Sequence, residues 1–291
     1  ILVATSGDTG KAALEGYKDV DSTKIMVFYP EDGVSDMQKM QMATQEGSNV
    51  CVTAIKGNFD DAQTGVKKIF TDNAVKEKLA ENNMLFSSAN SINWGRLAPQ
   101  IVYYVSAYCD MLGREGDYLK DGFNIVVPTG NFGNILAAYY AKKMGVPVNK
   151  LICASNANNV LTDFINTGVY DRNREFYTTA SPSMDILISS NLERMLFELS
   201  GNDDKAVADM QAKLSSEGKF AVSDEIKEKL QSLFFGGCCD DTETLATIKK
   251  YFTEYGYLAD THTAVALNVY EQYIKATEAY LPSSKILNKS N

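Results

Sequence analysis

Three short segments carry hydroxyl, amide or carboxylate side chains at points where a helix is expected to begin, and two of them also contain glycine. They are residues 5–11 (TSGDTGK), 128–134 (PTGNFGN) and 260–266 (DTHTAVA). The first N–H groups of a helix have no partner within the helix, and the helix dipole gives that end a partial positive charge. Where such an end follows a strand and a glycine turn, it predicts a site for a phosphate or a carboxylate.

The segment 5–11 fits either an anion-binding turn or an ordinary helix start. Its hydroxyl groups could donate to an anion, whereas Asp8 or Thr9 could simply cap the following helix. A P-loop would need a glycine five residues before Gly-Lys and a hydroxyl directly after it. Thr5 and Ala12 occupy those two positions, so the pattern argues against a P-loop.

The segment 128–134 places two glycines and two asparagines between an expected strand and a helix of small residues. Gly130 and Gly133 give a G-x-x-G spacing, which is not the dinucleotide fingerprint. No basic side chain lies in this loop, so a bound phosphate would be held by backbone N–H groups. A purely structural turn is the alternative.

His262 is the only histidine of the chain, which limits the chemistry that the third segment can support. A histidine-based zinc site or proton relay is disfavoured, and the chain has no G-x-S-x-G elbow of a serine hydrolase. A structural role is the usual one for a single histidine. The five cysteines form no C-x-x-C pair, although Cys238 and Cys239 are adjacent. They predict incidental roles and a reducing, cytoplasmic compartment.

Composition narrows the class of protein further. The 291 residues are 45% hydrophobic and 22% charged, which is enough for a sizeable core. The net charge of −9 and the absence of a basic stripe argue against nucleic-acid binding. No apolar run reaches the roughly 18 residues of a membrane span. The chain opens on the strand-like run ILVA, so we expect it to be a fragment of a longer enzyme.

Short apolar runs alternate with longer amphipathic segments. Strands are expected at residues 1–5, 24–29, 50–55, 84–87, 124–127 and 151–154. Helices are expected at residues 11–17, 35–45, 60–81, 95–112, 135–144 and 160–165, and over most of the chain after residue 182. Strands separated by helices predict parallel crossovers, and therefore two doubly wound α/β domains with a helical C-terminal part.

The polar, glycine-containing stretch 111–122 is the expected boundary between the two domains. It divides the chain into a smaller domain, residues 1–112, and a larger domain, residues 113–291. Within the larger domain, residues of about 201–230 are charged and poor in aromatic side chains. We expect them to form an exposed helical insertion.

Four motifs, in this order, resemble threonine synthase, a family that shares its fold with the β chain of tryptophan synthase. They are residues 6–10 (SGDTG), 89–96 (ANSINWGR), 130–134 (GNFGN) and 260–265 (DTHTAV). The resemblance spans most of the chain, but residues 201–245 carry no motif of the family. It implies a carbon–oxygen lyase that uses pyridoxal 5'-phosphate to convert O-phospho-L-homoserine and water into L-threonine and phosphate.

The resemblance also implies roles for individual residues. The phosphate group of the cofactor would be held in the larger domain by Gly130, Asn131, Phe132, Gly133 and Asn134. Thr263 would bond the pyridine nitrogen of the cofactor without forcing that nitrogen to be protonated. Substrate binding would fall in the smaller domain to Ser6, Asp8, Thr9, Ser91, Asn93 and Arg96. A guanidinium can hold a phosphate through two hydrogen bonds, although Arg96 could also form an ordinary ion pair.

The Schiff-base lysine of the family lies upstream of the SGDTG motif, and Lys11, on the following helix, is not its equivalent. We therefore expect this chain to lack the covalent cofactor link, to be inactive alone, and to self-associate through an exposed domain face. Two alternatives stay open. The chain could belong to a related pyridoxal-phosphate enzyme, such as a threonine dehydratase or a cysteine synthase, or to a non-catalytic homologue that acts as a binding module.

Overall fold

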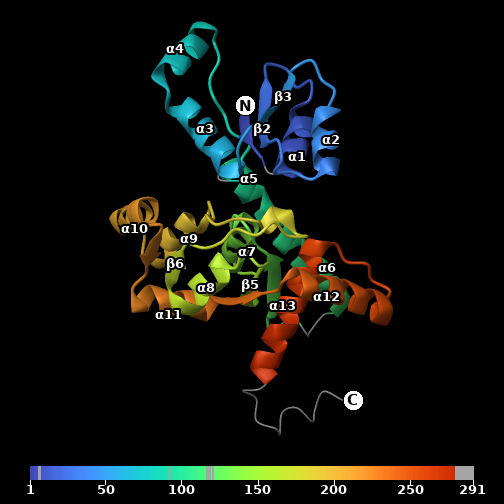
Figure 1. The fold of residues 1–291 in the computed structure, drawn as a ribbon. Helices are drawn as coiled ribbons and strands as arrows, with labels where there is room; N and C mark the ends of the chain where they lie inside the picture. The colour runs from blue at the N-terminus through green and yellow to red at the C-terminus, as the bar shows by residue number, and fades with distance from the viewer. Residues whose placement is uncertain (6–7, 92, 116–118, 120, 279–291) are drawn as a thin grey trace. The chain divides into compact units, whose positions relative to one another are not determined.

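The computed structural model describes residues 1–5, 8–91, 93–115, 119 and 121–278 (Figure 1). By their contacts the residues form two compact units, Ile1–Arg96 and Leu97–Asn291. The division lies before the boundary expected at residues 112–113. Helix α6 (Ile101–Glu115) belongs to the second unit because it packs against helix α7 (Gly133–Lys143).

The first unit is a three-stranded parallel sheet with helices on both faces, in the strand order β1-β2-β3. Its strands are β1 (Leu2–Ala4), β2 (Ile25–Pro30) and β3 (Val50–Ile55). Its helices are α1 (Asp8–Tyr17), α2 (Asp36–Ala43), α3 (Phe59–Thr71), α4 (Asn73–Glu81) and α5 (Trp94–Leu97), whose last residue belongs to the second unit. Successive side chains of β2 point to opposite faces. Val27 packs with Leu14 of α1, and Phe28 packs with Val66 of α3.

Two expected elements of the first unit differ in the structure. The helix expected over residues 60–81 is broken at Asp72, which ends α3 and caps α4 by accepting from Val75 N at 3.1 Å. The strand expected at residues 84–87 is reduced to an isolated bridge between Leu2 and Ser88. At Asp72 the local capping bond of the side chain interrupts the helical pattern.

The second unit contains a three-stranded parallel sheet in the order β4-β5-β8 and an antiparallel pair, β6 and β7. The strands are β4 (Phe123–Pro128), β5 (Val148–Ser155), β6 (Val169–Asp171), β7 (Lys219–Ala221) and β8 (Phe234–Cys238). Besides α6 and α7, the helices are η1 (Ala98–Gln100), α8 (Val160–Thr167), η3 (Pro182–Met184), α9 (Leu192–Leu199), α10 (Asp204–Glu217), α11 (Asp224–Leu233), α12 (Asp241–Tyr255) and α13 (Thr261–Glu278).

Helices also cover both faces of this second parallel sheet. Leu151 and Cys153 of β5 point into the main core, which α7, α8 and α9 complete. Ile152 and Ala154 point to the other face and pack against Val265 and Val269 of α13. The doubly wound α/β architecture expected from the sequence is therefore confirmed.

Strand β8 was not expected, because its sequence FFGGC does not alternate and contains two glycines. The glycines let helices approach the strand closely. A Cβ on Gly236 would lie 3.2 Å from Thr162 Cα of α8, and one on Gly237 would lie 2.7 Å from Val269 Cγ1 of α13. The described chain after residue 182 is mostly helical as expected, and β8 is one of the two short strands within it.

The segment expected to be an exposed helical insertion, residues 201–230, also contains a strand. Strand β7 pairs with β6, and Phe220 stacks on Tyr170 with ring centroids 5.4 Å apart. Phe220 is 3% exposed and belongs to the main core. One buried aromatic ring thus ties this charged segment to the rest of the unit.

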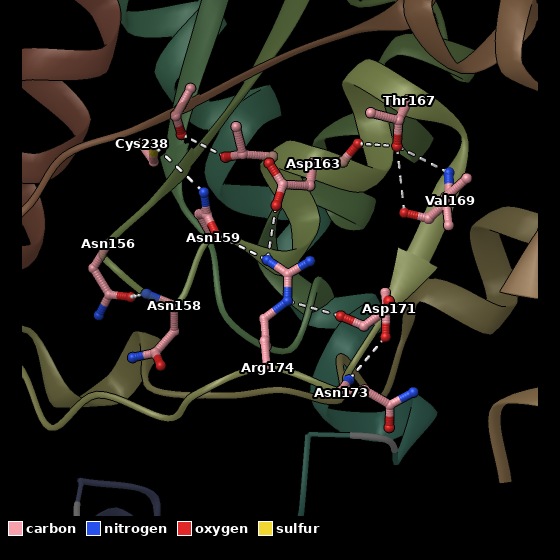
Figure 2. A network of polar contacts seen from close by, with 12 residues as sticks. Asn156, Asn158, Asn159, Asp163, Thr167, Val169, Asp171, Asn173, Arg174 and Cys238 are labelled. Carbon is pink, nitrogen blue, oxygen red and sulfur yellow. Dashed lines mark hydrogen bonds and ion pairs between the residues drawn. The ribbon is translucent and has the colours of Figure 1, made fainter. Parts of the chain in front are cut away.

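A polar network fastens the start of α8 to its neighbours (Figure 2). The guanidinium of Arg174 donates to Asn159 Oδ1 at 2.9 Å, to Asp163 Oδ2 at 2.8 Å and to Asp171 O at 2.8 Å. Asn159 Nδ2 lies 3.9 Å from Cys238 Sγ at the end of β8. One arginine therefore connects α8 to the chain that follows β6. Among the described residues, no helix is long and apolar enough to cross a membrane.

Candidate functional site

The loop between β4 and α7 lies at the carboxyl end of the parallel sheet. Pro128 pairs with Ala154, and Thr129 N donates to Ala154 O at 2.8 Å, so the pairing continues one residue beyond β4. The chain then turns through residues 130–132 into α7. In open α/β sheets, ligands bind at this edge.

Phe132 gives the loop an unusual backbone. It precedes α7 with φ 59° and ψ 6°, in the left-handed region, and its side chain makes no capping hydrogen bond. A bulky residue rarely adopts this conformation. The ring is 1% exposed and packs on Phe234 at 5.5 Å between centroids, which holds the residue in place. A left-handed residue followed by helical ones directs successive N–H groups into one concavity that suits an anion.

The backbone N–H groups of residues 130–134 make no hydrogen bond with the described part of the chain. The carbonyl groups of the same loop are engaged. Gly130 O and Asn131 O accept from residues 189–191, and Phe132 O accepts from Leu136 N at 3.1 Å. The loop therefore presents donors without competing acceptors.

The side chain of Asn134 is turned toward α6 and η1. Asn134 Nδ2 donates to Gln100 Oε1 at 2.9 Å, and Tyr104 Oη lies 2.5 Å from Asn134 Oδ1. Burial raises the pKa of Tyr104 well above its ordinary value, so this phenol stays protonated. Asn134 can therefore offer a ligand its backbone N–H, while its amide supports the helix start.

Helix α13 begins at a carboxylate. Asp260 Oδ1 accepts from His262 N at 2.9 Å and Thr263 N at 3.3 Å, and Asp260 Oδ2 accepts from the Thr263 hydroxyl. Partial burial raises the pKa of Asp260, but the hydrogen bonds from Thr263 and His262 outweigh it, and the net pKa is lowered. The carboxylate is therefore ionised at neutral pH.

His262 connects α13 to the loop after β4. Its Nδ1 lies 3.2 Å from Asp260 Oδ1, and its Nε2 accepts from Ser183 N at 3.2 Å. The acceptor role of Nε2 places the ring proton on Nδ1. Ser183 O in turn approaches Gly130, where an added Cβ would be 2.7 Å away. The segments 130–134 and 260–263 thus both adjoin Ser183 of η3 within the second unit.

The residues expected to bind substrate lie in the first unit, except Ser6, which is outside the described residues. Thr5 Oγ1 accepts from Gly10 N at 2.9 Å and so caps the start of α1. Asp8 Oδ1 accepts from Gln38 Nε2 of α2 at 3.0 Å, and Thr9 is half-buried. Part of the polar capacity of this turn is therefore used by the protein itself.

The segment 88–96 is fastened beside this turn. Asn90 acts like a strand residue: its Nδ2 donates to Ala4 O at 2.7 Å, and its Oδ1 accepts from Ala4 N at 3.3 Å. Asn93 Nδ2 donates to Ser88 O at 2.6 Å, and Asn93 Oδ1 accepts from Gly95 N at 2.9 Å. The Arg96 guanidinium donates to a backbone carbonyl, that of Ala89, and Ser91 is half-buried. The roles expected for Ser91, Asn93 and Arg96 stay predictions.

Metal or thiol chemistry has little support in the described residues. They contain no group of three or more His, Cys, Asp or Glu side chains that could hold a metal ion. The five cysteines are free, and burial raises the pKa of Cys153 to about 12 despite a hydrogen bond with Thr129. That thiol is a packing residue and not a nucleophile.

The sequence did not indicate several residues that shape the site. They are Ser189, Ser190, Asn191, Asn90 and Asp260. Asp260 had a signal, since an aspartate directly before a helix is a common cap. The others bond groups far away along the chain, which no local pattern reveals: a side-chain oxygen for Ser190, and backbone oxygens for Ser189, Asn191 and Asn90.

Comparison with solved structures first defines the class of fold. A pyridoxal 5'-phosphate-dependent aspartate racemase, 9% identical, superposes with a TM-score of 0.56 over 92% of this chain and 66% of that one. At this identity the likeness establishes only the fold. The PLP-bound threonine synthase from Brucella melitensis is much more similar, with 41% identity and a TM-score of 0.82 over 93% of this chain and 56% of that one.

Sequence relatives narrow the class to one family of homologues. Human threonine synthase-like 1 is 46% identical over 273 residues, which are 91% of this chain and 37% of that protein. Threonine synthase from Pseudomonas aeruginosa is 40% identical over 267 residues, 92% of this chain and 55% of that enzyme. No family model matches the chain. The chain is a homologue of threonine synthases, and it spans about half their length.

Proposed function

We propose that the protein is a threonine synthase, a carbon–oxygen lyase that converts O-phospho-L-homoserine and water into L-threonine and phosphate. The observation that carries the proposal is the loop 130–134, whose N–H groups bond nothing in the described part of the chain and whose carbonyl groups are engaged. The homology to threonine synthases supports the same conclusion. Pyridoxal 5'-phosphate would supply the electron sink for the reaction.

The residues present fit that cofactor at two points. A phosphate monoester matches the concavity at Phe132, because a dianion gains from several N–H donors and from the positive end of α7. Gly130, Asn131, Phe132, Gly133 and Asn134 would hold it through their backbones.

Thr263 would face the pyridine nitrogen. Its hydroxyl already donates a hydrogen bond to Asp260. The hydroxyl oxygen can therefore accept a further hydrogen bond but cannot donate one. A ring nitrogen that carries a proton therefore suits this position better than a bare one. The expectation that Thr263 bonds the pyridine nitrogen without forcing its protonation stays a prediction.

Residues of the first unit would bind the substrate. The α1 turn with Asp8 and Thr9, and the segment with Ser91, Asn93 and Arg96, carry the polar groups that an amino acid phosphate needs. Arg96 would hold the phosphate and Asp8 would orient the amino group, since opposite charges attract. Ser6 would act with them.

Three lysines of the second unit are already engaged with other groups of the protein. Lys142 donates to Val148 O, Lys143 pairs with Glu198 at 2.5 Å, and Lys150 donates to Gln231 O at 3.0 Å. We infer that borohydride reduction with pyridoxal phosphate traps no single lysine of residues 1–291. A specific adduct, located by peptide mass spectrometry, would contradict this.

The activity is tested by assaying the chain, and any longer protein that contains it, for phosphate release from O-phospho-L-homoserine with added pyridoxal phosphate. The expected result is threonine and phosphate in equal amounts from the longer protein, and no turnover by the chain alone. Formation of an oxoacid from threonine would favour a dehydratase instead. Cofactor binding without turnover by the longer protein would favour a binding module.

Similarity supports threonine synthase over a dehydratase. The tomato threonine deaminase is 16% identical with a TM-score of 0.58, against 41% and 0.82 for the Brucella enzyme. The substrate is a small molecule. The free cysteines agree with the reducing cytoplasm that we propose as the compartment, and self-association through an exposed face stays a prediction.

A further inference from the structure

We name residues 189–191, which directly precede α9, the strap, because two of them bond the carbonyl groups of Gly130 and Asn131. Ser189 Oγ donates to Gly130 O at 2.8 Å. Asn191 donates twice to Asn131 O, from its backbone N at 3.1 Å and from Nδ2 at 3.0 Å. The strap and the loop are about sixty residues apart along the chain.

The strap is firmly anchored. Asn191 is 0% exposed and Ser189 is 7% exposed. Ser189 N donates to Tyr170 Oη at 2.9 Å, and Tyr170 is itself buried in the main core. Helix α9, which follows directly, adds Leu192 and other buried side chains to the same core. The strap can therefore impose a direction on the loop and is not merely carried by it.

Peptide planarity turns these bonds into an orientation of the donors. In a trans peptide, the C=O of one residue and the N–H of the next point in opposite directions. With Gly130 O drawn to Ser189, the N–H of Asn131 points away from the strap. With Asn131 O drawn to Asn191, the N–H of Phe132 does the same. The left-handed backbone of Phe132 then leads directly into the first N–H groups of α7.

We propose that Ser189 and Asn191 are positioning residues, which fix the direction of the loop N–H groups and so determine the affinity for a phosphate monoester. The identity of the ligand rests on the proposed function. The strap acts on the loop through the carbonyl groups of Gly130 and Asn131. An unfixed carbonyl in this loop would turn toward the anion and repel it.

The test compares two probes that differ only in the phosphate group, pyridoxal 5'-phosphate and pyridoxal. Their dissociation constants for the chain are measured by equilibrium dialysis. Ser189→Ala is expected to weaken pyridoxal phosphate binding roughly tenfold, which corresponds to the loss of one charge-assisted hydrogen bond from a loop N–H to the phosphate. Pyridoxal binding is expected to stay unchanged. Ser189→Thr keeps the hydroxyl and is expected to restore the affinity. Asn191→Ala, which removes Nδ2, is expected to act like Ser189→Ala.

Ser200→Ala is the matched control, because Ser200 lies at the other end of α9 and its Oγ donates to Phe197 O at 2.9 Å. It should leave both dissociation constants unchanged. Retention of the wild-type preference for pyridoxal phosphate in folded Ser189→Ala and Asn191→Ala would overturn the proposal. So would failure of both variants to fold, since the strap would then be structural. If the unaltered chain itself shows no preference between the probes, the proposed cofactor loop fails instead.

Discussion

Two helix starts in this molecule follow a strand and a glycine-containing segment of sequence, yet they differ in how far the protein itself satisfies their N–H groups. At α1, the hydroxyl of Thr5 accepts from Gly10 N at 2.9 Å, and Asp8 adds a carboxylate to the first turn. At α7, no side chain caps the helix, and Phe132 holds a left-handed backbone. The first start is partly satisfied by the protein itself, and the second is prepared for an external anion.

The difference shows that a glycine turn before a helix does not by itself define an anion site. A helix start is open to an anion only if the nearby carbonyl groups are hydrogen-bonded elsewhere and no side chain caps the first N–H groups. Helix α13 supports the same rule, because Asp260 caps its first N–H groups. Of these three starts, α7 alone combines free N–H groups with engaged carbonyl groups in the described residues.

Phe132→Ala, at the start of α7, should have the largest effect on stability. The ring is 1% exposed and packs on Phe234 at 5.5 Å between centroids, so its loss leaves a cavity. We expect the free energy of unfolding to fall by about 3–5 kcal/mol, measured by urea denaturation. Phe252→Ala, at a position 56% exposed on α12, is the control and should change it by less than about 0.5 kcal/mol. An equally small effect at Phe132 would show that core packing does not hold the left-handed turn.

Gly130→Ala should damage the α7 start without removing any bond. Its Cβ would lie 2.7 Å from Ser183 O, a backbone atom that cannot move freely. We expect a loss of about 1–3 kcal/mol in unfolding free energy and loss of the preference for pyridoxal phosphate over pyridoxal. Gly113→Ala in α6, where a Cβ meets nothing within 4 Å, should instead stabilise the protein by up to about 1 kcal/mol. Unchanged binding in Gly130→Ala would mean that the loop tolerates displacement from η3.

The sequence allowed the parallel sheets and the loop 130–134 to be predicted, because these depend on alternation and on glycine spacing within a few residues. It did not reveal the strap, whose bonds to Gly130 and Asn131 depend on tertiary packing. Strand β8 was missed because two glycines replace the apolar alternation of a strand. Asp72 split an expected helix, because one side chain can end one helix and cap the next.

Thr5→Val tests the capped helix start, that of α1. The substitution keeps the shape of a side chain that is 1% exposed and removes the acceptor for Gly10 N. We expect unfolding free energy to fall by about 1–2 kcal/mol, while discrimination between pyridoxal phosphate and pyridoxal stays unchanged. Thr71→Val, which removes an exposed hydroxyl bond to Lys67 O at the end of α3, should have little effect. Altered discrimination in Thr5→Val would show that the two helix starts are not independent.

Asp260→Asn, at the start of α13, should have the smallest effect on stability. Because the folded pKa of Asp260 lies below its ordinary value of 3.8, its ionised form stabilises the fold at pH above that value. The contribution is lost as pH falls through the folded pKa. Asparagine still caps a helix, and the carboxylate is exposed to solvent, so the difference from the unaltered chain should stay below about 1 kcal/mol at neutral pH.

The measurement for Asp260→Asn is the thermal midpoint from pH 7 down to pH 3. The gap between the two proteins should narrow toward zero at the acid end. Asp203→Asn provides the control, because Asp203 caps α10 by accepting from Ala206 N at 3.0 Å and has no partner like Thr263. A gap that widens on acidification would mean that the carboxylate is destabilising when ionised. The α13 start would then resemble the open α7 start more than the capped α1 start.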